Sequence, residues 1–184
     1  MDATPSSDLH RRRSLRLADY DYGKVGAFFL TMSTLWGSCT LADIVGSDVY
    51  LTGWGEIVQE EWLRTPQIRP EVLLDEYVVM PNHFHAVVVV VEDTRPLPSV
   101  DKVIEAPEPT GVRRPARSLG SLVAGFKIST TKRINVLRGT PGAPFWQRNY
   151  YEHVVRNDVD MDRIRTYIRN NPLRWSDDEY NPSR

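Results

Sequence analysis

Two apolar segments separated by only two residues constrain the fold of this chain most. Residues 72–80 (VLLDEYVVM) and 83–91 (HFHAVVVVV) are rich in β-branched and aromatic side chains, which favour β-strands. The dipeptide Pro81-Asn82 lies between them and is typical of a turn. Because so short a connection joins only antiparallel neighbours, we expect the two segments to form a hairpin-like antiparallel pair.

The rest of the chain alternates between strand and helix patterns. Residues 27–35 (AFFLTMSTL) are aromatic and β-branched and predict another strand. Apolar residues at helical spacing and terminal signals such as Asn157 and Pro172 predict three helices, at 56–64, 118–137 and 158–171. Strands and helices interleave without a clean βαβ repeat, so the sequence predicts an α+β fold with an antiparallel sheet.

The chain has 184 residues, which suits one compact domain. We expect this domain to span residues 15–175, between a disordered polar tail at 1–14 and a C-terminal tail at 176–184. Residues 93–117 are rich in proline and charge, without hydrophobic periodicity, and predict a flexible insertion within the domain.

Composition excludes several classes of protein. The longest apolar run, residues 86–91, is far too short for a membrane-spanning helix, so we expect no membrane partner. The basic N-terminus has no apolar core after it and does not predict a secretory signal. A single cysteine, Cys39, excludes a disulfide framework and a cysteine-built zinc site, and it fits a cytoplasmic location.

The net charge of −1 hides a strong asymmetry along the chain. Residues 41–108 hold 13 acidic and 4 basic side chains, whereas residues 109–151 hold eight basic side chains and no carboxylate. A local basic stretch in a neutral protein is what a groove for a polyanion requires. A solvated helix face has the same composition, so both interpretations stay open at this point.

His83 and His85 are the first candidates for chemistry. Side chains alternate between faces along a strand, so the two imidazoles point the same way while Phe84 points into the opposite layer. Two imidazoles on one strand face can converge on a divalent cation, with a third ligand from elsewhere. The alternative is local hydrogen bonding at the start of the strand. A polar pair in so apolar a strand is costly, which favours the metal site.

Tyr167 and Asn171 lie four residues apart on the last predicted helix and share a face with Arg163. A phenol is a poor nucleophile at its usual pKa of about 10, but an adjacent cation and an electrophilic phosphate make it competent. Asn171 offers a carbonyl oxygen, a hard ligand suited to Mg²⁺ or Mn²⁺. A structural role for Tyr167 in the core or an interface is the alternative.

Residues 145–153 (FWQRNYYEH) interleave aromatic and polar side chains. Such a segment could stack on unpaired bases and hold phosphates, or it could be a packed connector. Tyr150 and Tyr151 are therefore rival nucleophiles, and His153 is a rival ligand.

These residues together resemble a known family. The run Tyr77-Val-Val-Met-Pro-Asn-His-Phe-His85 resembles the HUH signature of single-tyrosine transposases, in particular the REP-associated tyrosine transposases. Residues 16–22 are similar to that family's entry segment. Residues 146–157 and 167–172 are similar to its C-terminal block. In this order the pieces form a specific combination that covers most of residues 15–175.

The resemblance implies a ferredoxin-like α+β core of the HUH endonuclease type, with an antiparallel β-sheet and packed helices. By motif match, His83 and His85 correspond to the metal-binding pair and Tyr167 to the catalytic tyrosine. Asn171 matches a third ligand of the same divalent cation, Mg²⁺ or Mn²⁺.

The implied reaction is strand cleavage and joining of single-stranded, hairpin-containing DNA. Tyr167 attacks phosphorus, which leaves a 5′-phosphotyrosine link and a free 3′-hydroxyl, and a second 3′-hydroxyl reverses the step. The protein would be cytoplasmic and nucleoid-associated, acting as a monomer or homodimer. The basic stretch would contact the DNA backbone through five side chains, Arg117, Lys127, Lys132, Arg133 and Arg148.

Two alternatives to this enzyme remain open from the sequence. One is a non-catalytic nucleic-acid-binding descendant with the same fold and basic groove. The other is a metal-dependent phosphodiesterase that uses water as its nucleophile.

Overall fold

The computed structural model describes residues 25–91 and 118–184. The tail predicted at 1–14, the insertion predicted at 93–117 and Arg117 lie outside the described residues. In chain order the elements are β1 (Gly26–Ser33), η2 (Leu35–Gly37), β2 (Ala42–Val45), β3 (Asp48–Leu51), α1 (Gly53–Leu63), α2 (Thr65–Ile68), β4 (Val72–Val79), β5 (His83–Val90), α3 (Leu119–Arg138), β6 (Tyr151–Val155), α4 (Asp158–Asn170) and η3 (Pro172–Asp177).

The main sheet has four strands in the order β4-β5-β1-β6, and every neighbouring pair is antiparallel. The turn at Pro81-Asn82 joins β4 to β5, which confirms the predicted antiparallel pair. Strands β2 and β3 form a separate two-stranded sheet. The predicted α+β fold with an antiparallel sheet is therefore confirmed, although the sequence did not predict β2, β3 or β6.

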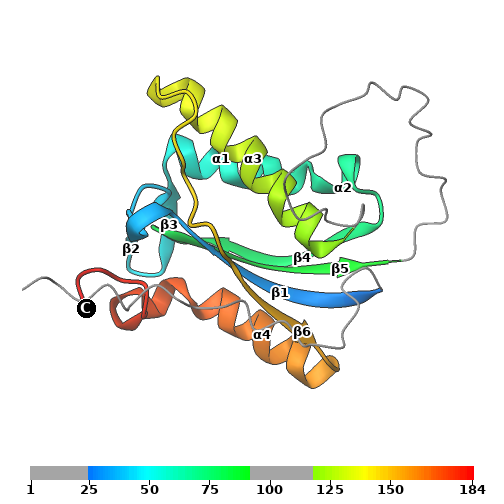
Figure 1. Cartoon of the computed structure of the whole chain (residues 1–184). Coiled ribbons are helices and arrows are strands. Elements are labelled where there is room, and N and C mark those ends of the chain that lie inside the picture. Colours follow the sequence, from blue (N-terminus) through cyan, green and yellow to red (C-terminus); the bar gives the residue numbers. More distant parts are fainter. Residues whose placement is uncertain (1–24, 92–117) are drawn as a thin grey trace, which may run out of the picture.

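Helices cover both faces of the sheet (Figure 1). Helices α1 and α3 pack together on one face, and α4 lies on the other against β4 and β5. Strand β5 contributes side chains to the core on both faces of the sheet, because successive side chains along a strand point to opposite faces. Phe84, Ala86 and Val88 belong to the cluster under α1 and α3, whereas Val87 belongs to the cluster under α4.

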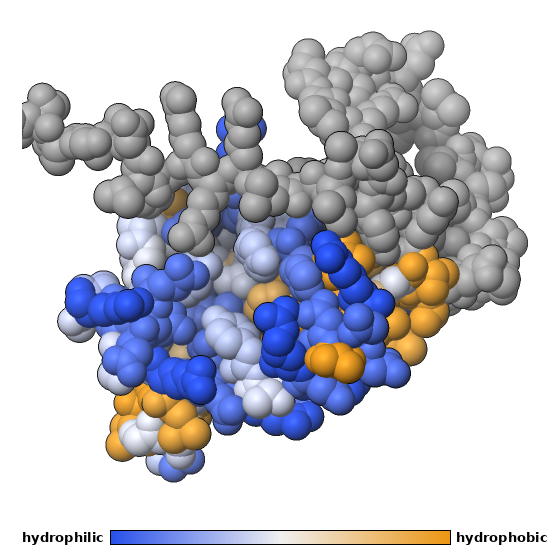
Figure 2. Space-filling model, turned by 90° about the horizontal axis from the view of Figure 1, so that it is seen from below, coloured by the Kyte–Doolittle hydropathy of each residue, from blue (hydrophilic) through white to orange (hydrophobic). Residues whose placement is uncertain are grey.

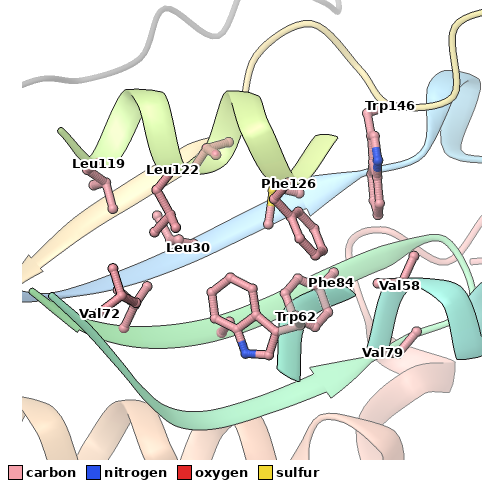
Figure 3. Close-up of a cluster of buried hydrophobic side chains, with 14 of the residues drawn as sticks. Leu30, Val58, Trp62, Val72, Val79, Phe84, Leu119, Leu122, Phe126 and Trp146 are labelled. Atoms are coloured by element: carbon pink, nitrogen blue, oxygen red, sulfur yellow. The ribbon is translucent and has the colours of Figure 1, made fainter. Parts of the chain in front are cut away.

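Aliphatic side chains and a group of aromatic rings fill the larger core layer, between the sheet and helices α1 and α3 (Figure 3). The Phe84 ring lies 5.1 Å from the Trp62 ring and 5.6 Å from the Phe126 ring, measured between centroids. All three side chains are buried. The residue between the two histidines thus anchors β5 in the core.

The helix ends follow from local capping. Ser118 caps α3 by accepting a hydrogen bond from the Ser121 N–H, and Gly139 ends it in the left-handed region at φ +65°. Asn157 caps α4 by accepting from the Asp160 N–H, and Pro172 directly follows the Asn171 C-cap. These signals explain why the predicted bounds of both helices agree closely with the observed ones.

Within residues 25–91 and 118–184, no helix has the length and apolar character needed to cross a bilayer.

Replacing Phe84 by alanine should lower the free energy of unfolding by about 3–5 kcal/mol, because the change opens a cavity beside two rings. Urea denaturation measures this loss. Leu73→Ala on the neighbouring strand β4 is the control, since Leu73 is exposed and its loss should cost about 0.5 kcal/mol or less. Equal losses in the two variants would contradict the packing described for β5.

Candidate functional site

His83 and His85 lie at the start of β5 and face the α4 side of the sheet. Both side chains are buried, and their ring centroids are 4.5 Å apart. Phe29 on β1 stacks against the His85 ring at 5.3 Å. The alternation predicted for residues 83–85 is therefore observed, with Phe84 in the opposite layer.

Hydrogen bonds to Nδ1 fix both imidazoles. Asn82 Oδ1 lies 2.9 Å from His83 Nδ1, and because this oxygen can only accept, His83 Nδ1 must donate. Thr31 Oγ1 lies 2.8 Å from His85 Nδ1. We assign the same tautomer to both rings, which leaves a lone pair on each Nε2 atom.

The two Nε2 atoms have different surroundings. His83 Nε2 is buried and has no hydrogen-bond partner among the described residues. His85 Nε2 lies 3.3 Å from the Tyr167 hydroxyl, which can donate to it. His85 Nε2 thus faces the C-terminal half of α4, and the His83 ring lies directly beside the His85 ring.

Helix α4 brings Tyr167 and Asn171 to that region. Ile164 and Ile168, on the buried face of the helix, pack against Phe29 and Val87. Tyr167 is 41% exposed, and its ring lies 5.2 Å from the His85 ring. The outward side of the helix is mostly hydrophilic (Figure 2).

Ion pairs to β4 hold α4 in place. A register shift in the β4–β5 pairing lies between Leu74 and Tyr77, and it contains Asp75 and Glu76. The Asp75 carboxylate accepts hydrogen bonds from Arg165 at 2.8 and 2.6 Å, and these bonds lower the pKa of Asp75. Glu76 accepts from Arg169.

Asn171 is buried beside the histidines. Its side chain raises the pKa of His83 and lowers the pKa of Tyr167, each against the larger effect of burial. Its Oδ1 nevertheless accepts no well-formed hydrogen bond from the described residues. An unsatisfied carbonyl oxygen next to an unsatisfied imidazole nitrogen is unusual in a protein interior. Both atoms are acceptors, so a cation or an external donor would satisfy them together.

Burial keeps the histidines neutral. It lowers the pKa of His83 to about 3, against a smaller opposing effect of Asn171. Burial also lowers the pKa of His85 well below its usual value, and the neighbouring His83 adds to this effect. Neutral imidazoles are the form that binds metal ions.

These donors fit a divalent cation. His83 Nε2 and His85 Nε2 are imidazole ligands, which suit transition-metal ions, whereas Asn171 Oδ1 is a carbonyl oxygen of the kind that suits Mg²⁺ and Mn²⁺. In the described part of the chain, no group of three histidine, cysteine or carboxylate side chains could hold a metal. Among the described residues, the Asn171 amide oxygen is therefore the candidate third ligand beside the two imidazoles.

Residues 172–184, part of which the sequence assigns to a tail, pack against the histidine pair. The Tyr180 ring lies 4.5 Å from the His83 ring, and the Trp175 ring lies 6.1 Å from it. The Tyr180 carbonyl oxygen accepts a 2.6 Å hydrogen bond from Asn82 Nδ2. Sequence reasoning missed this segment and missed Asn82, which it interpreted only as a turn residue.

Burial raises the pKa of Tyr167 to about 12, and the charges of Asp178, Tyr180 and Glu179 add to the effect. The C-terminal segment therefore opposes ionisation of the phenol that α4 brings to the histidines.

Of the rival candidates, Tyr151 lies on the same face of the sheet as the histidines, since its ring lies 6.2 Å from the Phe29 ring that stacks on His85. His153 Nε2 lies 2.8 Å from the Asp160 carboxylate, which also accepts a hydrogen bond from Arg163. Tyr151 on β6 is 47% exposed and pairs with Thr31, and Tyr150 lies under the Lys127 ammonium group. None of the interactions described for His153 or Arg163 reaches the histidine pair.

Two of the predicted DNA-contacting cations have partners within the protein. Arg133 pairs with Glu60 and Glu61 on α1. Lys127 donates to the carbonyl oxygens of Gln147 and Asn149, both at 2.9 Å, and burial lowers its pKa to about 8. Lys132 and Arg148 are exposed. Of the predicted DNA-contacting residues that the structure describes, Lys132 and Arg148 are therefore the two that remain available to a polyanion.

No family model matches this chain. The chain is 31% identical over 177 residues to an uncharacterized protein of Haemophilus influenzae, and the match covers 95% of each chain. The two proteins belong to one family.

A solved structure of a REP-associated tyrosine transposase bound to a REP hairpin has the same fold. The match has a TM-score of 0.53 at 19% sequence identity and covers 86% of this chain and 74% of that chain. At this identity the likeness establishes the fold alone. The α+β fold of this protein is thus the fold of that transposase.

Replacing Asp178 by asparagine should lower the pKa of Tyr167 from about 12. The drop should be partial, because burial remains the larger cause. An ultraviolet titration of each protein, with the signal of its Tyr167→Phe version subtracted, measures this pKa. Asp177→Asn, at an exposed neighbouring position, is the control and should change nothing. Identical titrations of the Asp178 and Asp177 variants would exclude the proposed charge effect.

Proposed function

We propose that this protein cleaves and rejoins single-stranded DNA through a covalent 5′-phosphotyrosine intermediate on Tyr167. The 3.3 Å contact between the Tyr167 hydroxyl and His85 Nε2 is the observation that carries this proposal, since it joins residues 82 positions apart. A phenol beside two neutral imidazoles, at the surface of a transposase fold, supports transesterification of a phosphodiester.

We infer that His83 and His85, with Asn171, would hold a divalent cation, Mg²⁺ or Mn²⁺. When bound, such a cation polarises a phosphate oxygen and stabilises the negative charge that develops on the phosphoryl group. The side chains of Asn82 and Thr31 orient the two rings for this purpose through their hydrogen bonds to Nδ1.

The reaction balances without an external energy source. The Tyr167 oxygen forms a bond to phosphorus, the bond from phosphorus to the 3′-oxygen breaks, and that oxygen takes up a proton. Since Tyr167 is 41% exposed, the phenol can reach a phosphate from the solvent side and release its own proton to water. The covalent link conserves the energy of the broken bond, so a free 3′-hydroxyl can reverse the step and join strands.

We extend the proposed substrate to DNA with a hairpin, because the transposase of similar fold is bound to a REP hairpin. Lys132 and Arg148 would contact backbone phosphates, as both are exposed cations in a stretch that has no carboxylate.

Replacing Tyr167 by phenylalanine should abolish a covalent adduct between the protein and DNA. The full chain is incubated with a single-stranded hairpin oligonucleotide labelled at its 3′ end and Mn²⁺, and adducts are separated on a denaturing gel. Tyr151→Phe is the matched control, because Tyr151 is the rival nucleophile, is similarly exposed and packs against the same Phe29 ring as Tyr167. It should form the adduct at an undiminished rate.

Other outcomes of this assay separate the alternatives. An adduct that needs Tyr151 rather than Tyr167 would overturn the assignment of the nucleophile. Cleaved DNA without linked protein, unaffected by Tyr167→Phe, would identify a phosphodiesterase that uses water. Tight binding of many DNAs with neither product would identify a non-catalytic binding protein.

Replacing Asn171 by alanine should weaken Mn²⁺ binding by about tenfold or more, because loss of a ligand costs at least as much as loss of its supporting partner. Electron paramagnetic resonance of free Mn²⁺ measures the affinity without DNA or catalysis. The adjacent Asn170→Ala is the control and should bind Mn²⁺ like the unmodified protein. If both variants bind equally well, Asn171 is not a ligand.

A further inference from the structure

Trp36 combines two unfavourable features in one short turn. It lies in η2, directly after β1, and its side chain is 80% exposed. Its backbone has φ +61° and ψ +15°, and within residues 25–91 and 118–184 it is the only non-glycine residue with positive φ. A bulky side chain in this region is strained, and such strain persists where the surrounding structure enforces it.

The hydrogen bonds of the turn show what enforces it. The Thr34 N–H donates to the Asn82 carbonyl oxygen at 2.9 Å, and Asn82 Nδ2 donates to the Gly37 carbonyl oxygen at 3.0 Å. The same Asn82 side chain accepts from His83 Nδ1. The backbone of the turn that carries the exposed indole is thus joined to the candidate metal ligand His83 through the Asn82 amide.

A second set of contacts ties the turn to the basic part of the chain. The Leu35 N–H donates to the Phe145 carbonyl oxygen at 2.7 Å, and Thr34 forms a β-bridge with Trp146. Phe145 and Trp146 line a groove of about 610 Å³ between the C-terminal half of α3 and the segment that follows it.

This groove combines an apolar floor with a basic rim. Ile128 and Val136 lie on the α3 side, while Lys132 and Arg148 supply positive charge, and none of the residues that line it is a carboxylate. Single-stranded nucleic acid, whose flat bases are joined by negatively charged phosphates, matches such a surface. A protein partner would not require a groove whose charged side chains are all positive.

We propose that Trp36 is a stacking platform for an unpaired base of the DNA strand that is held at the histidine pair. The strand then continues from the indole toward the groove beside Phe145. This inference rests on the proposed function, and it adds a residue that neither the family resemblance nor the metal site requires. Stacking on an indole face is tolerant of sequence, because every base presents a flat ring.

The test measures binding alone. A fluorescein-labelled single-stranded oligonucleotide of mixed sequence is titrated with the full chain in EDTA, so that no cleavage occurs, and its anisotropy gives the Kd. Trp36→Gly should raise the Kd by about tenfold or more, whereas Trp36→Phe, which keeps an aromatic face, should stay within about threefold of the unmodified protein. Tyr50→Ala removes an exposed aromatic ring from β3 and should leave the Kd unchanged.

Thermal melting separates stacking from a structural role. Glycine adopts positive φ without strain, so the Trp36→Gly protein should melt no lower than the unmodified protein while it binds DNA less tightly. A lower melting temperature together with weaker binding in both Trp36 variants would make the indole a structural residue and overturn the proposal.

Two further results would overturn the proposal without affecting the proposed chemistry. An unchanged Kd in Trp36→Gly would remove the stacking role, even if the Tyr167 adduct still forms. Normal DNA binding with a smaller assembly in sedimentation would make Trp36 a contact between protein copies. Conversely, an absent adduct with the expected loss of binding would remove the catalytic proposal and keep the stacking role.

Discussion

The buried amide of Asn82 is the contact on which the arrangement of the site depends. Its oxygen accepts from His83 Nδ1, and its nitrogen donates to the carbonyl oxygens of Gly37 and Tyr180. A planar amide offers an acceptor and two donors at fixed positions, and an aspartate of the same size would lack the donors. One side chain therefore sets the tautomer of an imidazole, the turn after β1 and the position of the C-terminal segment.

The register of the sheet completes the arrangement. Strand β1 runs antiparallel to β5 with Thr31 opposite His85, so the threonine hydroxyl is supplied by the neighbouring strand. The ion pairs of Arg165 and Arg169 with the irregular part of β4 hold the helix that carries the phenol. Rigid supports of this kind fix the side chains in advance, as the proposed reaction would require.

Much of this arrangement could be predicted because it depends on local periodicity. The period of two along β5 separates the imidazoles from Phe84, and the spacing of four on α4 places Tyr167 and Asn171 on one face. Capping residues such as Asn157 fix helix ends through neighbours in the chain. In each case the information lies within a few residues.

The features that the sequence did not predict depend on distant partners. Arg133 belongs to a basic stretch, yet its charge is satisfied by Glu60 and Glu61, which lie about 70 residues earlier. Strand β6 has only five residues, two of them polar, and it pairs with the edge of β1, which no local pattern indicates. The packing of Tyr180 on His83 joins the last residues to the centre of the sheet, which no local pattern encodes.

The alternation along β5 makes this protein tolerant of changes in composition and intolerant of changes in length. Losing or gaining one codon just after the Pro81-Asn82 turn would shift the strand by one residue. The imidazoles would then enter the aromatic layer around Trp62, and a phenylalanine would take their place beneath α4. Divergence within this family is therefore expected to proceed in β5 by substitution of apolar residues, with insertions and deletions confined to the connections.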